Sequence, residues 1–227
     1  MASRTALITS VLLLLLLVAP SSSLVTFDLH GNVHPVGFLY VTLKIGEPAW
    51  EYNLDVDTGS ILTWVQCNVP NCRGDCKKVQ RWKYIYDLLY RWPQTHPYYE
   101  RTPAKLVSRN DPLCQVLHPL PGGEKQCPYH INYVMGDSRG LLIHDKFTLP
   151  SSQHTFAFGC GYDQTWGQHQ PPVAVDGLLG LGRGSSVSLI SQLKKEHAIT
   201  KDVISQCISK GGGVFSTLGI TSTPQAQ

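Results

Sequence analysis

Apolar and polar residues alternate along several short stretches of the chain, as expected for half-buried β-strands. We predict a strand over residues 38–45, a turn over residues 46–48 and an antiparallel partner strand over residues 52–56. β character resumes over residues 61–66. The first third of the chain therefore indicates a domain built mainly from strands.

The second half of the chain continues this pattern. Residues 127–134 and 141–149 are expected to form a hairpin around residues 135–140, and residues 155–158 a short strand. Residues 176–182 form an apolar run punctuated by glycine.

One helix is predicted over residues 187–196, with Ser186 as its N-cap. Its buried stripe is expected to consist of Val187, Leu189, Ile190 and Leu193. Residues 24–37 show no pattern, and residues 67–76 are interpreted as a loop stapled by cysteines.

The composition is that of an ordinary globular protein, with 42% hydrophobic and 15% charged residues among 227. Its 20 glycines and 15 prolines favour a strand-rich and loop-rich domain over a helical bundle. The net charge of +3 is small, and no block of Lys and Arg accompanies it. We therefore expect no nucleic-acid partner.

The N-terminus has the features of a secretory signal peptide over residues 1–23. Arg4 provides a positive charge, residues 7–18 are apolar, and Ser21 and Ser23 form a small-x-small cleavage site. The apolar run is shorter than a membrane-spanning helix requires, although an uncleaved anchor is the alternative. We expect the protein to be secreted, or delivered to the vacuole through the secretory pathway, without a membrane partner after cleavage.

Secretion makes the seven cysteines candidates for disulfide bonds. An odd number requires that at least one is free, pairs with another chain or has lost its partner. The cluster within residues 67–76 also permits zinc, but no histidine lies at ligand spacing, and an oxidising compartment favours disulfides. We expect neither a metal nor a cofactor. The cysteines are Cys67, Cys72, Cys76, Cys114, Cys127, Cys160 and Cys207.

Candidate chemistry lies at the end of the strand over residues 52–56, where Asp57, Thr58, Gly59 and Ser60 follow in a tight turn. An acid at such a junction is held rigidly. Two carboxylates on two such loops can share one proton and activate a water molecule. The chain contains a single Asp-Thr/Ser-Gly triplet, and the same residues are also good turn formers in any fold.

Five stretches, in this order, resemble the pepsin-like aspartic protease family, and more narrowly its plant nucellin-like branch, related to xylanase-inhibitor-like proteins. The resemblance implies a mostly β fold, a pepsin-like N-terminal lobe over residues 24–215, shaped as a closed-barrel or sandwich-like β domain with short helices. The matching stretches are residues 40–48, 57–67, 156–164, 176–183 and 207–213.

The resemblance also implies roles for the turn. Asp57 would be one of two catalytic aspartates, and Thr58 would bond to the matching loop of a second lobe. Gly59 would shape the turn. Ser60 would hydrogen-bond the outer carboxylate oxygen and favour its ionised form, unless it is a plain turn hydroxyl.

Two aromatic residues belong to the implied site. Tyr133 would be the flap tyrosine that closes over the substrate, and the indole N–H of Trp64 would hydrogen-bond its hydroxyl. Each is alternatively an ordinary core aromatic. Residues 176–182 would thread beneath the catalytic loop.

The implied activity is an aspartic-type endopeptidase that acts on proteins or peptides. The C-terminal lobe of the family is not found in the sequence, so a separate lobe or self-association would complete the site. Residues 81–99 resemble an aromatic-rich insertion, and residues 216–227 a disordered tail. The alternatives are a non-catalytic extracellular binding or inhibitor protein on the same scaffold, and a non-functional gene fragment.

Overall fold

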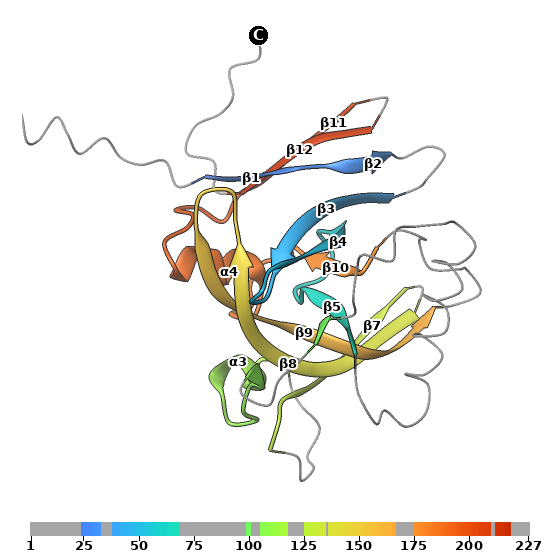
Figure 1. Cartoon of the computed structure of the whole chain (residues 1–227), viewed down its shortest axis with the longest axis vertical. Coiled ribbons are helices and arrows are strands. Elements are labelled where there is room, and N and C mark those ends of the chain that lie inside the picture. Colours follow the sequence, from blue (N-terminus) through green and yellow to red (C-terminus); the bar gives the residue numbers. More distant parts are fainter. Residues whose placement is uncertain are drawn as a thin grey trace, which may run out of the picture.

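A computed structural model describes residues 24–32, 38–68, 99–100, 105–117, 125–134, 136–166, 175–209 and 212–218 (Figure 1). The expected signal peptide, nearly all of the aromatic-rich stretch, Cys72, Cys76 and residues 219–227 lie outside these ranges.

Strands dominate the described part of the chain, with two short helices between them. In chain order the elements are β1 (Val25–Asp28), β2 (His30–Asn32), β3 (Phe38–Ile45), β4 (Trp50–Asp57), β5 (Trp64–Asn68), β6 (Tyr99–Glu100), α3 (Pro112–Gln115), β7 (Pro128–Tyr133), β8 (Gly136–Thr148), β9 (Gln153–Trp166), β10 (Gly177–Gly180), α4 (Leu189–Lys195), β11 (Ile204–Ser209) and β12 (Gly212–Leu218).

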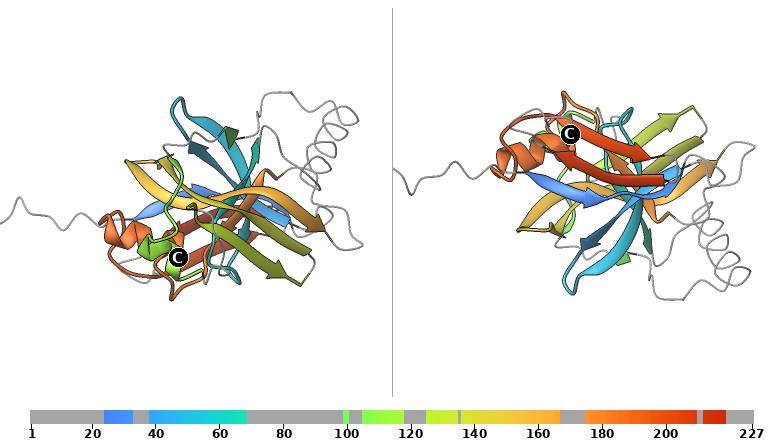
Figure 2. Two further views of the ribbon diagram at one scale, coloured as in Figure 1. Left: turned by 90° about the horizontal axis from the view of Figure 1, so that it is seen from below. Right: turned by 90° about the horizontal axis from the view of Figure 1, so that it is seen from above.

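The larger sheet follows the order β2-β3-β4-β10-β5-β9-β8-β7, and β6 pairs with β5. Because β3 also pairs with β8, the strand order returns to its start and the sheet closes on itself. Figure 2 shows the long strands β8 and β9 curving across the molecule. The predicted fold class, a closed-barrel-like β domain, is confirmed.

A smaller sheet of β1, β12 and β11 lies at the top of Figure 1, beside β2 and β3. The sequence prediction missed β1 and β2, because each strand is only three or four residues long. Residues 216–218, predicted as the start of a disordered tail, belong instead to β12, because Ser216, Thr217 and Leu218 pair with β1.

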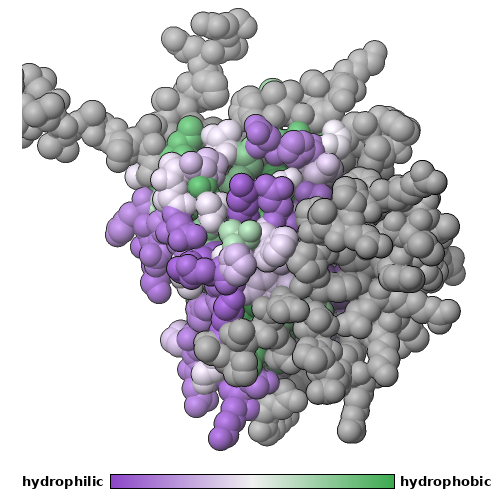
Figure 3. Space-filling model, viewed as in Figure 1, coloured by the Kyte–Doolittle hydropathy of each residue, from purple (hydrophilic) through white to green (hydrophobic). Residues whose placement is uncertain are grey.

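The core of the barrel is built from aromatic and aliphatic side chains of the curved strands. Phe147 meets Phe156 and Phe158 edge-on, with ring centroids 5.4 and 5.1 Å apart. Leu54 of β4 and Leu179 of β10 are buried in the same cluster. On the face shown in Figure 3, the described surface is mainly hydrophilic, as expected for a strand face turned to water.

The first predicted strand coincides with β3, and its antiparallel partner is β4. The hairpin of β7 and β8 is also confirmed. Its turn is shorter than predicted, because Tyr133 pairs directly with Gly136 and strand β8 begins there rather than at residue 141. The cause is the length of β8, whose 13 residues extend the ladder through the expected loop.

The predicted helix exists as α4, but it begins two residues later than expected. Ser188, rather than Ser186, is the N-cap, and its Oγ accepts a hydrogen bond from the backbone N–H of Ser191 at 3.2 Å. Leu189, Ile190 and Leu193 are buried as predicted. Gln192 adds a buried polar link, because its amide bonds both backbone groups of Ala157 on β9.

Two disulfide bonds lie within the described residues, Cys67–Cys160 and Cys114–Cys127. Cys67 was expected to staple the loop over residues 67–76, and this is wrong, because its partner lies on β9, the strand beside β5. Cys207 is exposed and carries a free thiol. No helix in the described ranges is long and apolar enough to cross a membrane.

Candidate active site

Asp57 is the last residue of β4, and its carboxylate is fixed by the bend that follows. The backbone N–H of Gly59 donates to Asp57 Oδ1 at 2.7 Å. Asp57 stays partly exposed, while Thr58 and Gly59 are exposed. The turn therefore presents an oriented carboxylate to solvent, which is what general acid or base chemistry needs.

Residues 176–182 run against this turn, as the family resemblance implied. Strand β10 lies between β4 and β5, and Gly180 pairs with Asp57 in parallel register. The N–H of Leu181 donates to the carbonyl of Asp57 at 2.8 Å, and the N–H of Gly182 donates to the carbonyl of Ser60 at 2.7 Å. The backbone on both sides of the bend is thus hydrogen-bonded to β10 and its continuation.

Ser60 departs from the expectation drawn from the resemblance. Its side chain is buried, with 8% exposure, and Oγ makes no hydrogen bond within the described part of the chain. The predicted bond to the outer oxygen of Asp57 is therefore absent. The Ser60 hydroxyl lies close to the phenol of Tyr133 instead, and it lowers the phenol's pKa.

Tyr133 ends β7 and is held by Trp64, the first residue of β5. Trp64 Nε1 donates to the Tyr133 hydroxyl at 2.9 Å, so the expected hydrogen bond between them is present. Trp64 is also a core residue, because it is 4% exposed and packs with Tyr129 and Leu62. Trp64 therefore makes the expected hydrogen bond and is a core residue as well.

The electrostatics place Tyr133 within reach of Asp57. Burial and, to a smaller extent, the negative charge of Asp57 raise the pKa of the Tyr133 phenol to about 12, against the hydrogen bond from Trp64, which lowers it. Two residues far apart in sequence therefore interact across the site. Val134, next in the chain, forms a fully exposed tip of the hairpin, with 103% relative exposure.

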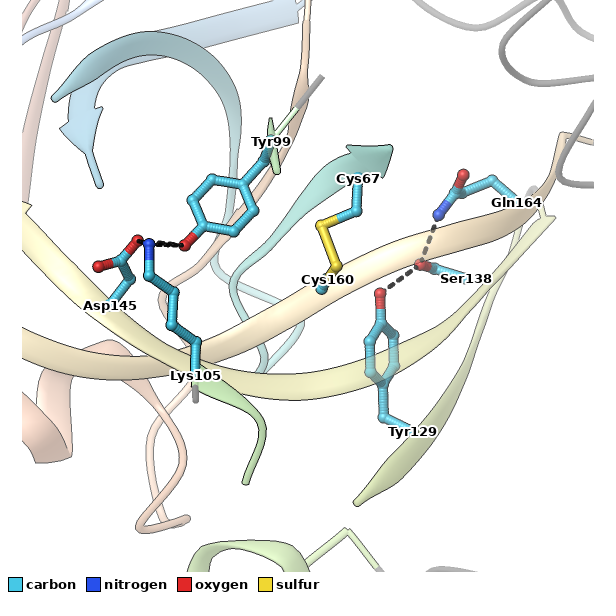
Figure 4. The surroundings of a disulfide bond; sticks show 8 residues. All are labelled: Cys67, Tyr99, Lys105, Tyr129, Ser138, Asp145, Cys160 and Gln164. Carbon is cyan, nitrogen blue, oxygen red and sulfur yellow. Dashed lines mark hydrogen bonds and ion pairs between the residues drawn. A yellow bond between two sulfur atoms is a disulfide. The ribbon is translucent and has the colours of Figure 1, made fainter. Parts of the chain in front are cut away.

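Two buried polar groups support the strands behind the site (Figure 4). Tyr129 and Ser138 hydrogen-bond through their hydroxyls at 3.0 Å, and the Gln164 amide approaches Ser138 Oγ at 3.5 Å. The second buried polar group lies on the other side of the Cys67–Cys160 disulfide. There Lys105 pairs with the buried carboxylate of Asp145 at 2.7 Å, and the Tyr99 hydroxyl donates to the same carboxylate.

Asp55 is a candidate site residue that the sequence reasoning missed. It lies two positions before Asp57 on β4, so alternation places both side chains on one face of the strand. Burial and, to a smaller extent, the charge of Asp57 raise the pKa of Asp55 to about 6, against a backbone hydrogen bond at Val56 that lowers it. The i, i+2 spacing was the available signal, but it does not reveal burial.

The Asp55→Asn variant is expected to be more stable than the wild type at pH 7.5. In the folded state the pKa of Asp55 lies above its usual 3.8, so ionising this carboxyl opposes folding. The cost is absent below pH 3.8 and is fully present above about pH 6. After solvent screening of a partly exposed group, we expect a gain of about 1–2 kcal/mol.

Urea unfolding of both proteins at pH 7.5 and pH 3.5 measures this gain. It should largely vanish at the lower pH, where most of this carboxyl is neutral in both the folded and unfolded states. An equal gain at both values, or a loss at pH 7.5, would contradict the assigned burial of the charge.

No group of three or more His, Cys, Asp or Glu side chains that could hold a metal ion occurs within the described ranges. The chemistry available at the site is that of an oriented carboxylate beside a tyrosine hydroxyl. With the closed β barrel, this arrangement defines the N-terminal lobe of a pepsin-like protein.

Sequence comparison agrees with this class. The family model described as "Xylanase inhibitor N-terminal" matches residues 39–219. The chain is 44% identical over 234 residues to an aspartic proteinase of Oryza sativa subsp. japonica, an alignment that covers 99% of this chain and 52% of that protein. It is 30% identical over 213 residues to "Aspartic proteinase 39" of Arabidopsis thaliana, covering 87% of this chain and 42% of the relative.

The chain therefore belongs to the plant pepsin-like aspartic protease family, in which it matches the N-terminal lobe. It spans about half the length of the curated relatives reported above.

Proposed function

We propose that the chain acts as the N-terminal half of an aspartic-type endopeptidase of the nucellin-like branch, with Asp57 as one of two catalytic aspartates. The observation that carries this proposal is the placement of Asp57. Its carboxylate is fixed by Gly59, remains accessible, and acts electrostatically on the hydroxyl of Tyr133. An oriented carboxylate beside an exposed hairpin tip suits activation of a water molecule over a bound peptide.

The proposed reaction needs a second carboxylate. Two aspartates sharing one proton polarise a water molecule, which attacks the scissile carbonyl, while the second aspartate protonates the leaving amine. The 227 residues contain one Asp-Thr/Ser-Gly triplet, so the partner carboxylate must come from outside them. Thr58 is exposed beside Asp57 and is available to bond a second such loop.

Tyr133 has the proposed role of flap residue. Its phenol stays protonated throughout the physiological range, because burial raises its pKa to about 12. It can therefore act as a hydrogen-bond donor or acceptor without contributing charge. Trp64 fixes the position of its hydroxyl, and closure of the hairpin over a peptide would exclude water from Asp57.

We also propose entry into the secretory pathway. The N-terminal apolar stretch and the two disulfides of the described residues support an oxidising destination outside the cell or in the vacuole.

A second candidate function is non-catalytic binding of an extracellular enzyme. It is favoured by the description of the matching family model, which names an inhibitor. The intact hydrogen bond at Asp57 and the Trp64–Tyr133 pair favour the protease, because an inhibitor that binds elsewhere on the scaffold needs neither.

Retention on pepstatin-agarose at pH 4.5 distinguishes these two functions. The full chain should be retained and eluted by free pepstatin, whereas the Asp57→Asn variant should pass through. Asp28→Asn, an exposed aspartate of β1, is the matched control and should be retained. The binding protein would be favoured if all three proteins, or none of them, were retained, and if in addition the chain captured a cell-wall hydrolase whether or not Asp57 was intact.

A further inference from the structure

A second carboxylate faces the same side of β4 as Asp57. The strand alternates, with Tyr52 and Leu54 buried on one side and Asp55 and Asp57 partly exposed on the other. Residues two apart in a strand lie roughly 6.5–7 Å apart. Asp55 is therefore within the reach of one amino-acid side chain from the proposed catalytic carboxylate.

The surroundings of Asp55 are apolar rather than cationic. Directly opposite it in the ladders lie Tyr40 of β3 and Leu178 of β10, and residues opposite each other present side chains to the same face. Both are partly buried. These two side chains flank the carboxyl and offer a surface for the aliphatic stem of a long side chain.

Asp55 lacks a positive partner within the described ranges, and this sets it apart from two other shielded acids of the barrel. Asp145 pairs with Lys105 at 2.7 Å, and Asp137 pairs with Arg139 at 3.3 Å. Neither Asp55 nor Asp57 forms an ion pair with a described residue. A shielded carboxylate without a counter-charge is costly to the protein and favourable for a cationic ligand.

The turn that follows Asp57 adds a buried polar group. Ser60, 8% exposed, carries a buried hydroxyl with no hydrogen bond to any described residue. This hydroxyl and the carboxylate of Asp57 both act on the Tyr133 phenol, so both lie in the neighbourhood of that phenol. An unsatisfied buried hydroxyl there is an available partner for a bound peptide.

We propose that, at near-neutral pH, Asp55 determines substrate choice at this site by accepting the guanidinium or ammonium group of a basic residue next to the scissile bond. The proposal rests on the proposed function of Asp57. A cation at Asp55 gains a charge-assisted hydrogen bond, while its methylene groups pack against Tyr40 and Leu178.

The preference should depend on pH in a defined direction. The titratable groups on the side of Asp55 are Asp57 on its own strand, Tyr40 on β3 and, in tilted ring contact with Tyr40, His30 on β2. Strand β10 contributes the neutral Leu178. Burial raises the pKa of Asp55 to about 6, so its charge is present above that value and is lost below it. The preference for a basic residue should be lost in the same direction.

The test measures binding of two peptides in which a secondary alcohol replaces the scissile carbonyl. One carries arginine on both sides of the alcohol, and the other carries citrulline, the neutral isostere. Calorimetry with the full chain at pH 7.5 should give about tenfold tighter binding of the arginine peptide. The preference should disappear in Asp55→Asn, and in the wild type at pH 4.5.

Glu51→Gln is the matched control, because Glu51 is an exposed carboxylate on the same face of β4 and pairs with Lys44 at 3.5 Å. It should retain the preference. Equal affinity of both peptides for the wild type at pH 7.5, preference retained in Asp55→Asn, or no binding of either peptide would overturn the proposal. The wild-type pH comparison tests it independently of any variant.

Cleavage of a neutral peptide is measured separately, because it distinguishes failure of the proposed function from failure of the proposed role of Asp55. If the arginine preference depends on Asp55 but no peptide is cut, the recognition role stands and the protease role fails. If a neutral peptide is cut without any arginine preference, only the role of Asp55 is overturned.

Discussion

Replacing Gly177 with alanine should destabilise the barrel by about 4 kcal/mol or more. Gly177 lies in β10 between two neighbours, paired with Leu54 of β4 and Val65 of β5. A Cβ atom there would lie 2.0 Å from the carbonyl oxygen of Trp64 and 2.9 Å from Val65 Cα. Both are backbone atoms held in the sheet, so relief requires opening a ladder on one side.

Urea unfolding of the variant and of Gly184→Ala measures this effect. Gly184 has φ +89° and no atom within 4 Å of a built Cβ, so its substitution tests backbone strain without a clash. We expect a cost of about 1–2 kcal/mol for that control. A Gly177→Ala cost as small as the control's would contradict the close packing of β10 beneath Asp57.

Removing the Cys67–Cys160 disulfide is the second change with a large expected effect. The bond joins β5 to β9 across a sequence separation of 93, for which chain entropy predicts a loss of about 4–5 kcal/mol. The double variant Cys67→Ala/Cys160→Ala should therefore be close to unfolded in mild denaturant. Its effect should reach the site, because Trp64 begins the strand that Cys67 anchors.

The second disulfide provides the matched comparison. Cys114 and Cys127 are fully buried as well, but their separation is 13, which predicts about 3 kcal/mol. Free energies of unfolding from urea titrations of the two double variants should therefore differ, with the Cys67–Cys160 variant the less stable. The opposite order would show that strand context, rather than loop length, determines the contribution of each bond.

Local sequence patterns predicted those parts of the fold that depend on neighbouring residues. Alternation over residues 38–45 gave β3 with its correct bounds, because one face of that strand packs in the core. The same reasoning gave the helix but missed its start, because Ser186 and Ser188 are equally good caps and only packing distinguishes them. Ser188 is the buried one in the structure, and it is the N-cap of α4.

Features that join distant segments were not predictable from local pattern. β1 pairs with β12 near the other end of the chain, and Cys67 meets a cysteine 93 positions away. The contact of Trp64 with Tyr133 was anticipated through the family resemblance rather than from periodicity. Asp55 escaped notice because alternation reports which face a residue occupies, whereas its burial comes from β3 and β10 on either side.

The central claim is that Asp57 is a catalytic carboxylate, and peptide-bond cleavage tests it most directly. The full chain, processed at residue 23, is incubated with a denatured protein at mildly acid pH, beside Asp57→Asn and the control Asp28→Asn. We predict pepstatin-sensitive cleavage by the wild type and the control, with the second carboxylate supplied by self-association, and a loss of about 10³-fold or more in Asp57→Asn. Cleavage that persists undiminished in Asp57→Asn, or no cleavage by folded wild-type protein, would contradict the account for this chain.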